Sequence, residues 1–363
     1  MTAGAATMVA QAPTLYFIFP GDPDTRTGGY AYGREIVAAM RRGGAAVKVL
    51  ALPDGFPNPP ADVREEAAGL LETIPEGAAV IFDGLACGAM PEETVALAAR
   101  AKVVALVHHP LADESGLEES ASRRFFESEK RSLDTVRHII VTSAFTAMRL
   151  GDFGVGEDRI TVIEPGTDAA PLARGTAPSG PVTLLTVASV TPRKAYPDLL
   201  RALQPLSGLD WRLDCVGGLE MDRRHAHSVL AQAAPFGDKV RFHGALPPDA
   251  LPALYDQADL FVSPSHYEGY GMAIAESAAC GLPILAASGG AVPFTTAGKT
   301  AMLYDPGDVE ALSAALKTLL VDPSARQALR ERALSAREDL PTWDVSGKRC
   351  RDLMQRIIED QLS

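Results

Sequence analysis

Short apolar runs rich in β-branched residues alternate with amphipathic stretches along the chain, a pattern that predicts parallel sheets covered by helices on both faces. Strands buried on both sides form nearly continuous apolar runs, which is what these segments show. In the first half of the chain, the predicted strands are residues 14–19, 45–50, 79–83, 102–107, 137–142 and 159–164.

The second half restarts the same alternation. Its predicted strands are residues 182–188, 211–216, 239–243, 259–263 and 282–287. A helix is predicted after them, with one apolar face formed by Val309, Leu312, Leu316 and Leu319. Between the halves lies a stretch rich in Pro, Gly and Ser, residues 168–181, of the kind that links domains.

The chain is therefore predicted to be an α/β protein with two facing, doubly wound, Rossmann-like domains. Its length of 363 residues agrees with two domains rather than one. The first domain is predicted to span residues 1–169 and the second residues 170–344. Ligands bind at the carboxyl ends of the strands in such sheets, so the two domains should share one cleft.

Composition narrows the choice of partners. The net charge of −12 argues against nucleic acid or an anionic membrane surface as the main partner, because phosphate-rich polymers recruit basic faces. The four cysteines are far apart and lack metal-ligand spacing, so reduced thiols in a cytoplasmic protein are expected. They are Cys87, Cys215, Cys280 and Cys350.

No targeting or membrane segment is predicted. Residues 1–13 lack the basic start and apolar core of a signal peptide, and no later run approaches the roughly 18 apolar residues of a membrane helix. A cytoplasmic protein without an integral membrane segment is expected.

The most informative segment is residues 263–290, which read as strand, loop, helix and strand. Gly269 and Gly271 allow close approach of the backbone to a ligand, and the helix that follows directs free N–H groups toward the cleft. Glu268 can accept hydrogen bonds from sugar hydroxyls, and Glu276 can accept two from a ribose diol. Alternatively, the two carboxylates are helix caps or dipole partners, or a glycosidase pair, although a glycosidase needs neither the Rossmann-like setting nor the glycine turn.

With its two glutamates in an E-x7-E arrangement, this segment resembles the retaining glycosyltransferases of family 4, which have the GT-B architecture. The resemblance also covers residues 142–168, 187–203 and 301–316, in the same order and spacing. It implies a first domain that binds the acceptor, a second domain that binds the nucleotide-sugar donor, and a final helix, about 345–363, that packs back on the first domain.

Arg193 and Lys194 follow the predicted strand 182–188, at the carboxyl edge of the second sheet. Two fixed cations there can neutralise the charge that grows on a departing diphosphate, without a metal ion. The resemblance supports this role, although the earlier position where many members have arginine is Ser189 here. Which of the two cations touches the phosphate is left open, and solvated loop cations are the alternative interpretation.

Two features of the first domain match the resemblance. Gly28 and Gly29 resemble the family's glycine loop beside the donor phosphates or the acceptor, although a flexible turn is the simpler interpretation; the G-x-G-x-x-G fingerprint is absent. His108 and His109 end the strand 102–107, and the resemblance implies that one of them, preferably His108, orients a sugar hydroxyl or the acceptor. The other is expected to be a packed loop residue.

Further donor contacts are implied around residues 242–245 of the second domain, where the family meets the nucleobase through backbone groups and packing. An ordinary strand-to-helix turn is the alternative there. After Gly289 and Gly290 the family often has an acidic residue, whereas this chain continues to Phe294. The complete set expected at the donor is Gly28, Gly29, Ser189, His243, Gly244, Gly269, Tyr270, Gly271, Met272 and Glu276, with Arg193, Lys194, Glu268 and His108 expected to be catalytic.

The sequence therefore predicts a metal-independent, retaining transfer of a sugar from a nucleotide diphosphate sugar, UDP- or GDP-linked, with no cofactor. No metal-binding D-x-D stands at a suitable strand end, and the leaving phosphate can take the acceptor's proton. The acceptor is left open among a small metabolite, a glycan and a lipid, and the acidic charge disfavours the lipid. The rival interpretations are a GT-B epimerase or phosphorylase and an inactive sugar-nucleotide-binding protein.

Overall fold

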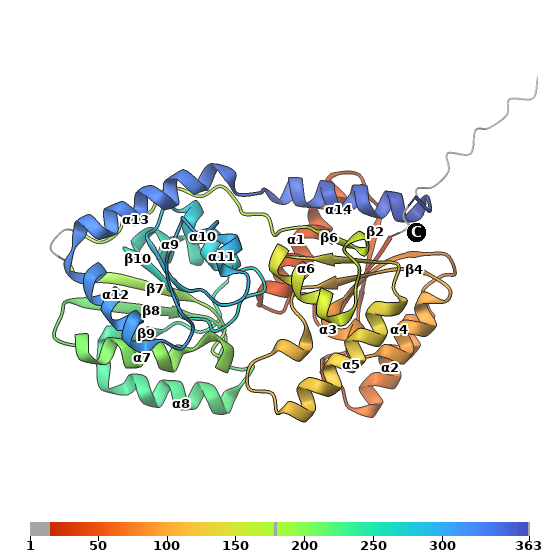
Figure 1. Ribbon diagram of the computed structural model, residues 1–363, viewed down its shortest axis with the longest axis horizontal. Helices are drawn as coiled ribbons and strands as arrows, with labels where there is room; N and C mark the ends of the chain where they lie inside the picture. The colour runs from red at the N-terminus through yellow and green to blue at the C-terminus, as the bar shows by residue number, and fades with distance from the viewer. Residues whose placement is uncertain (1–14, 178–179, 248, 362–363) are drawn as a thin grey trace, which may run out of the picture.

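The computed structural model describes residues 15–177, 180–247 and 249–361. Residues 1–13, expected to carry no targeting signal, and residues 178–179 of the expected linker lie outside this part. Two parallel six-stranded sheets, each flanked by helices, lie side by side along the long axis of the molecule (Figure 1). The predicted fold class of two doubly wound α/β domains is confirmed.

The first sheet has the strand order β2-β1-β3-β4-β5-β6. Each strand pairs in parallel with its neighbours, and the order changes direction between β1 and β3, where ligands bind in such folds. Its strands are β1 Leu15–Phe19, β2 Val47–Ala51, β3 Ala79–Asp83, β4 Lys102–Val107, β5 His138–Val141 and β6 Ile160–Val162.

Helices cover both faces of this sheet, and their apolar sides complete two buried clusters. They are α1 Gly28–Arg42, α2 Ala61–Glu72, α3 Gly84–Cys87, α4 Pro91–Ala98, α5 Glu119–Thr135 and α6 Ala144–Leu150. Asp83 caps α3 and Ser143 caps α6 by accepting from backbone N–H groups of the first turn. Gly28 and Gly29, predicted to lie in a loop, form the first turn of α1 instead.

The second sheet has the order β12-β11-β10-β7-β8-β9. Its order changes direction between β7 and β10, which are paired neighbours. The strands are β7 Val182–Val187, β8 Trp211–Val216, β9 Val240–Phe242, β10 Leu260–Ser263, β11 Ile284–Ala287 and β12 Met302–Tyr304. The three-residue strand β12 was not predicted.

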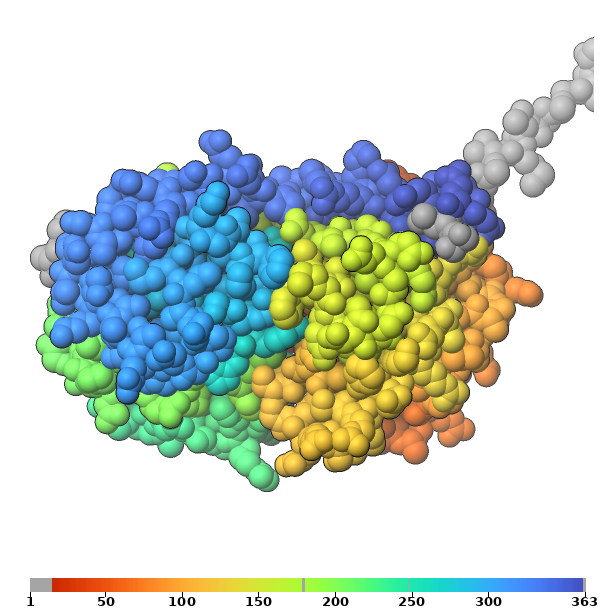
Figure 2. All heavy atoms as spheres, in the orientation of Figure 1, coloured from red at the N-terminus to blue at the C-terminus, as the bar shows by residue number. Residues whose placement is uncertain are grey.

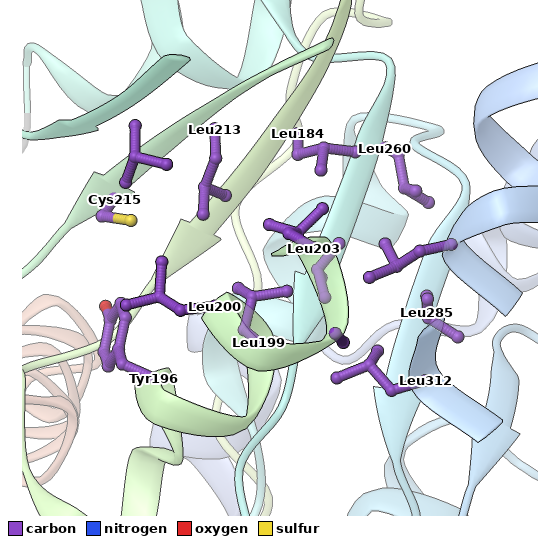
Figure 3. Packing of buried hydrophobic residues seen from close by; sticks show 14 of the residues in the cluster. Leu184, Tyr196, Leu199, Leu200, Leu203, Leu213, Cys215, Leu260, Leu285 and Leu312 are labelled. Atoms are coloured by element: carbon purple, nitrogen blue, oxygen red, sulfur yellow. The ribbon is translucent and has the colours of Figure 1, made fainter. Parts of the chain in front are cut away.

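The helices of this domain are α7 Tyr196–Leu203, α8 Arg223–Ala233, α9 Leu251–Gln257, α10 Met272–Ala279, α11 Val292–Thr295, α12 Val309–Val321 and α13 Pro323–Ala336. As predicted for α12, Leu312, Leu316 and Leu319 are fully buried and Val309 packs beside them. Figure 3 shows α7 and α12 side chains meeting residues of β7, β8, β10 and β11 in one apolar layer, which fixes the carboxyl edge of this sheet.

The chain returns to the first domain at its end. Helices α13 and α14 (Trp343–Ile358) follow one another along one side of both domains (Figures 1 and 2). Trp343, Leu353 and Ile357 are buried in a cluster with residues of α1 and the first sheet. A Cβ on Gly347 would lie 2.4 Å from that of Ala39, so glycine allows this close packing of α14 on α1.

The two crossings between the domains touch each other. The Thr167 amide donates to the Pro341 carbonyl over 2.7 Å, and the Ser346 hydroxyl donates to the Glu164 carbonyl over 2.7 Å. A Cβ on Gly166 would lie 2.2 Å from the Trp343 nitrogen. These contacts hold the two crossing segments together between the domains.

All four cysteines are buried and free of disulfides. Within residues 15–177, 180–247 and 249–361, no helix combines the length and apolar character needed to span a bilayer.

Candidate active site

Lys194 and Glu268 meet at the point where the strand order of the second sheet reverses. Lys194 ends the short 3-10 turn Pro192–Lys194 after β7, and Glu268 follows the neighbouring strand β10. The Lys194 ammonium donates to both carboxylate oxygens of Glu268, over 2.6 Å to Oε1 and 2.8 Å to Oε2. The two residues that the sequence predicted to share a cleft thus form an ion pair at the edge of the second sheet.

Arg193 lies beside this pair and reaches the first domain. Its Nη1 donates to the Tyr267 carbonyl over 2.7 Å and lies 3.6 Å from a Glu268 oxygen. Its Nε donates over 3.1 Å to Glu114, a residue of the first domain. Arg193 and Lys194 therefore stand as two adjacent cations near the junction of the domains, with side chains only 16% and 15% exposed.

The environment keeps Glu268 ionised. Burial alone would raise the pKa of this carboxyl group, but the charges of Lys194 and Arg193 outweigh burial and lower it below its usual range. Burial lowers the pKa of the Lys194 ammonium, and its contact with Glu268 opposes that shift. Two charges this poorly hydrated are tolerated because each neutralises the other.

Glycines shape the loop that carries Glu268. A Cβ on Gly290 would lie 2.4 Å from the Glu268 carbonyl, and one on Gly289 would lie 2.1 Å from the His266 carbonyl. Gly271 has φ of +96° immediately before α10, a conformation that disfavours other residues. The sequence thus sets the Glu268 loop tightly against the turn after β11.

Glu276 lies on the second turn of α10, as predicted. Its Oε2 accepts a hydrogen bond of 2.7 Å from the Tyr255 hydroxyl of α9. Burial raises the pKa of Glu276, the Tyr255 bond counters this shift, and the nearby Asp168 adds to it. A donor such as a ribose hydroxyl would stabilise the charged form of this carboxyl group.

His108 stands at the opposing edge, at the end of β4. Its Nε2 lies 3.2 Å from Asp83 at the end of β3, and its ring meets Tyr32 edge-on. A Cβ on Gly29 would lie 3.3 Å from the His108 ring. The predicted glycine pair and His108 therefore lie together, and Met272 of α10 packs near Gly28 from the second domain.

His109 is directed to a different set of groups. Its Nε2 lies 3.2 Å from Glu114, and its ring centre is 5.8 Å from that of Tyr267. Burial lowers the pKa of His109; Glu114 counters this shift and Arg193 adds to it. Both histidines have a carboxylate partner at 3.2 Å and nearly equal exposure, so which of the two is the packed loop residue stays a prediction.

Several predicted donor residues contact other parts of the protein. His243 hydrogen-bonds Asp214 over 2.7 Å, and Gly244, with φ of +69°, accepts from the Gly217 amide. The Ser189 carbonyl accepts from the Thr191 amide. Tyr270 is buried, and its carbonyl accepts from the Thr295 hydroxyl.

Sequence reasoning missed three acidic partners, Asp83, Glu114 and Asp198. Asp198 of α7 hydrogen-bonds His266 over 2.7 Å, beside the Glu268 loop. The sequence did contain a signal for Asp83. This carboxylate ends the apolar strand β3, and His108 directly follows the neighbouring strand β4. Glu114 lies in a segment without a motif. Asp198 lies within the matched segment 187–203, where the sequence indicated no role for it, and only the folded chain brings both residues to the site.

Aromatic rings line the junction of the domains near this site. Phe145 of α6 lies 5.8 Å from Tyr267 and 6.0 Å from Phe294, measured between ring centres. Phe294, at the point where the sequence departs from the resembled pattern, is 45% exposed. Across the part of the chain that the structure describes, no three His, Cys, Asp or Glu side chains gather as a metal-ligand set.

Residues 172–335 match the family model for glycosyl transferases group 1, and residues 78–170 match the model for Glycosyltransferase Family 4. The structure has the two-domain GT-B fold, and each of its domains matches a glycosyltransferase family model. The boundary between the two matches lies in the stretch predicted to link the domains.

Proteins with similar sequences are also glycosyltransferases. The O-antigen chain mannosyltransferase B of Escherichia coli is 30% identical over 61% of this chain and 61% of its own length. The D-inositol 3-phosphate glycosyltransferase of Thermobispora bispora is 33% identical over 64% of this chain and 58% of its own. The chain thus matches less than two thirds of the length of these relatives.

Solved structures show the same fold over nearly the whole chain. Sucrose-phosphate synthase from Thermosynechococcus elongatus superposes with a TM-score of 0.80 at 20% identity, covering 96% of this chain and 100% of that one. Anabaena HepE in complex with UDP and glucose superposes with a TM-score of 0.72 at 16% identity, covering 95% and 100%. At these identities the likeness concerns the fold.

Proposed function

We propose that this protein transfers a sugar from a nucleotide diphosphate sugar to an acceptor hydroxyl, with retention of anomeric configuration and without a metal ion. The observation that carries the proposal is the cluster of Arg193, Lys194 and Glu268 at the switch point of the second sheet. Two adjacent, mostly covered cations suit a diphosphate, and the neighbouring carboxylate suits sugar hydroxyls. The HepE structures, solved with UDP, glucose and UDP-glucose, are consistent with this donor class.

In the proposed reaction, the bond between the anomeric carbon and the diphosphate oxygen breaks, and its electron pair leaves with the nucleoside diphosphate. Arg193 and Lys194 stabilise the charge that develops on that oxygen. The acceptor oxygen forms the new bond on the same face of the sugar. Its proton passes to the departing phosphate, so no separate protein base is needed.

The two domains divide the recognition of substrates in this proposal. Glu268 holds hydroxyls of the donor sugar and Glu276 holds the ribose, while residues 242–245 lie near the nucleobase. The first domain binds the acceptor, with His108 orienting a hydroxyl and Asp83 orienting the imidazole. The location is proposed to be cytoplasmic, where nucleotide sugars are available.

A panel of nucleotide sugars tested by thermal shift checks the proposed donor class. A ligand that binds the folded state raises the melting temperature by mass action, and at 100 times its Kd the added stability is about 2.7 kcal/mol. We expect one UDP- or GDP-linked sugar to produce the largest shift. Sugar phosphates without a nucleotide should produce none, and a panel without any stabilising nucleotide would refute the donor assignment.

Replacement of Glu276 with alanine should weaken the binding of the bare nucleoside diphosphate by at least about tenfold, because two hydrogen bonds to a charged acceptor are lost. Calorimetry with the diphosphate measures this change. Glu331→Ala, an exposed substitution of the same kind on α13, should bind like the parent. Equal affinity of Glu276→Ala and the parent would remove Glu276 from the ribose role.

Donor turnover should persist in excess chelator, because fixed cations rather than a metal ion are proposed to meet the diphosphate. The release of nucleoside diphosphate is measured with and without EDTA. The proposed cation mechanism predicts equal rates. Loss of activity with EDTA, restored by magnesium or manganese, would contradict it.

A further inference from the structure

One ion pair near the candidate site joins the two domains and is not explained by the proposed reaction. Glu114 follows β4 in the first domain, yet its Oε1 accepts from Arg193 Nε of the second domain over 3.1 Å. Arg193 is one of the two cations proposed to meet the donor diphosphate. A carboxylate oxygen therefore contacts the guanidinium on which a phosphate oxygen would be expected to bind.

The charges around Arg193 and Lys194 show what donor binding has to overcome. Glu268 and Glu114 balance the charges of Arg193 and Lys194. The contacts of Glu114 with His109 and Arg193 outweigh burial and lower the pKa of its carboxyl group to about 2, so it is ionised at neutral pH. A diphosphate that binds to Arg193 and Lys194 approaches the two carboxylates that already contact these cations. The negative charges of the diphosphate and the carboxylates repel each other at such short range.

Glu114 has other partners to keep if it leaves Arg193. Its Oε2 lies 3.2 Å from His109 Nε2, and its Oε1 accepts from the Ser115 amide over 3.2 Å. The side chain is also 41% exposed, so water can replace the guanidinium. Displacement of Glu114 from Arg193 therefore leaves no buried, unpaired carboxylate, so the free-energy cost of the exchange is small.

The backbone that carries Glu114 is anchored independently of Arg193. The buried Glu129 carboxylate of α5 accepts from the Leu111 and Ala112 amides over 2.7 and 3.1 Å. Asp113 accepts two hydrogen bonds of 2.8 Å from Arg149 of α6. The exchange of anions at Arg193 thus requires movement of the Glu114 side chain rather than of the whole segment.

We propose that Glu114 is a built-in competitor of the donor diphosphate: it neutralises Arg193 across the domain junction in the nucleotide-free protein and is displaced when the diphosphate binds. This inference rests on the proposed function, because it assigns Arg193 to the diphosphate. It adds that the first domain sets the affinity of the second domain for its nucleotide. It also makes the Glu114–Arg193 contact between the domains sensitive to occupancy of the donor site.

Calorimetry of UDP and GDP with Glu114→Gln, an isosteric substitution, tests this role. Removing the competing charge should tighten diphosphate binding by about fivefold, the order expected for a partly exposed ion pair. The gain should shrink at high salt, because screening weakens the competition. Glu118→Gln removes the same charge from an exposed position nearby and should leave the affinity unchanged.

A double-mutant cycle with Arg193→Ala separates competition from a general change in charge. Arg193→Ala should weaken diphosphate binding. The double variant with Glu114→Gln should bind the diphosphate no more tightly than Arg193→Ala alone. If Arg193→Ala weakens binding while Glu114→Gln leaves it unchanged or weakens it, the competitor role is wrong and the proposed function stands. If the folded parent binds neither diphosphate, the proposed function fails and this inference fails with it.

Discussion

Lys194→Ala is expected to lower the rate of donor cleavage by at least about a hundredfold, the size of effect seen when one donor that stabilises transition-state charge is removed. The loss of ground-state donor affinity should be smaller, because the charge that Lys194 meets grows as the anomeric bond breaks. Release of nucleoside diphosphate measures the rate, and calorimetry with the intact donor measures the affinity. Lys299→Ala, at an exposed position of the same domain, is the matched control.

A second variant is needed because Lys194→Ala leaves its partner Glu268 in place. Lys194 donates to both oxygens of the buried Glu268, so Lys194→Ala leaves this carboxylate with less compensation and also reduces stability. Lys194→Gln retains a hydrogen-bond donor for Glu268 but lacks the charge. Both variants should lose the same part of the rate at temperatures where they are folded. Normal turnover by folded Lys194→Gln would show that the charge is not catalytic.

Gly269→Ala should abolish most turnover while leaving nucleotide affinity almost unchanged. A Cβ at this position would lie 2.3 Å from the His108 carbonyl of the opposite domain, a distance that backbone atoms cannot accommodate. The domains would have to stay farther apart, and misplacement of reacting groups by about 1 Å can cost on the order of a hundredfold in rate. Rate measurements and small-angle scattering, which reports domain separation, check this expectation.

Gly208→Ala provides the control for the glycine substitution, since a Cβ at Gly208 would meet no atom within 4 Å. This variant should retain the rate and the scattering profile of the parent. A Gly269→Ala protein with parental turnover would contradict the view that the close contact between Gly269 and His108 belongs to the reactive arrangement. If Gly269→Ala instead weakens binding of the bare nucleoside diphosphate, the substitution disturbs the second domain itself rather than the spacing of the domains.

The sequence predicted the strands well because their signal is local. Runs such as 79–83 and 102–107 are apolar and β-branched, and both became strands with the predicted bounds. The strand β12 was missed because three residues carry too little pattern. Gly28 and Gly29 were placed in a loop, but packing of α1 on the sheet outweighs the low helix propensity of glycine.

The site was only partly predictable for a related reason. Carboxyl edges of neighbouring strands converge, so Lys194 and Glu268 could be placed in one cleft from the strand pattern. The contact of Arg193 with Glu114 depends on how two domains face each other, which no local pattern encodes. Likewise, only the folded chain shows that Gly269 packs against the His108 carbonyl of the first domain.

The most direct test of sugar transfer follows the donor by phosphorus NMR, using the nucleotide sugar selected by thermal shift with and without candidate acceptors. The proposed function predicts nucleoside diphosphate as the phosphorus product, with the sugar recovered in equal amount on an acceptor or on water, and a much slower reaction with Lys194→Gln. Appearance of a sugar 1-phosphate that depends on inorganic phosphate, of an epimerised nucleotide sugar, or of no product with any donor and acceptor would contradict it.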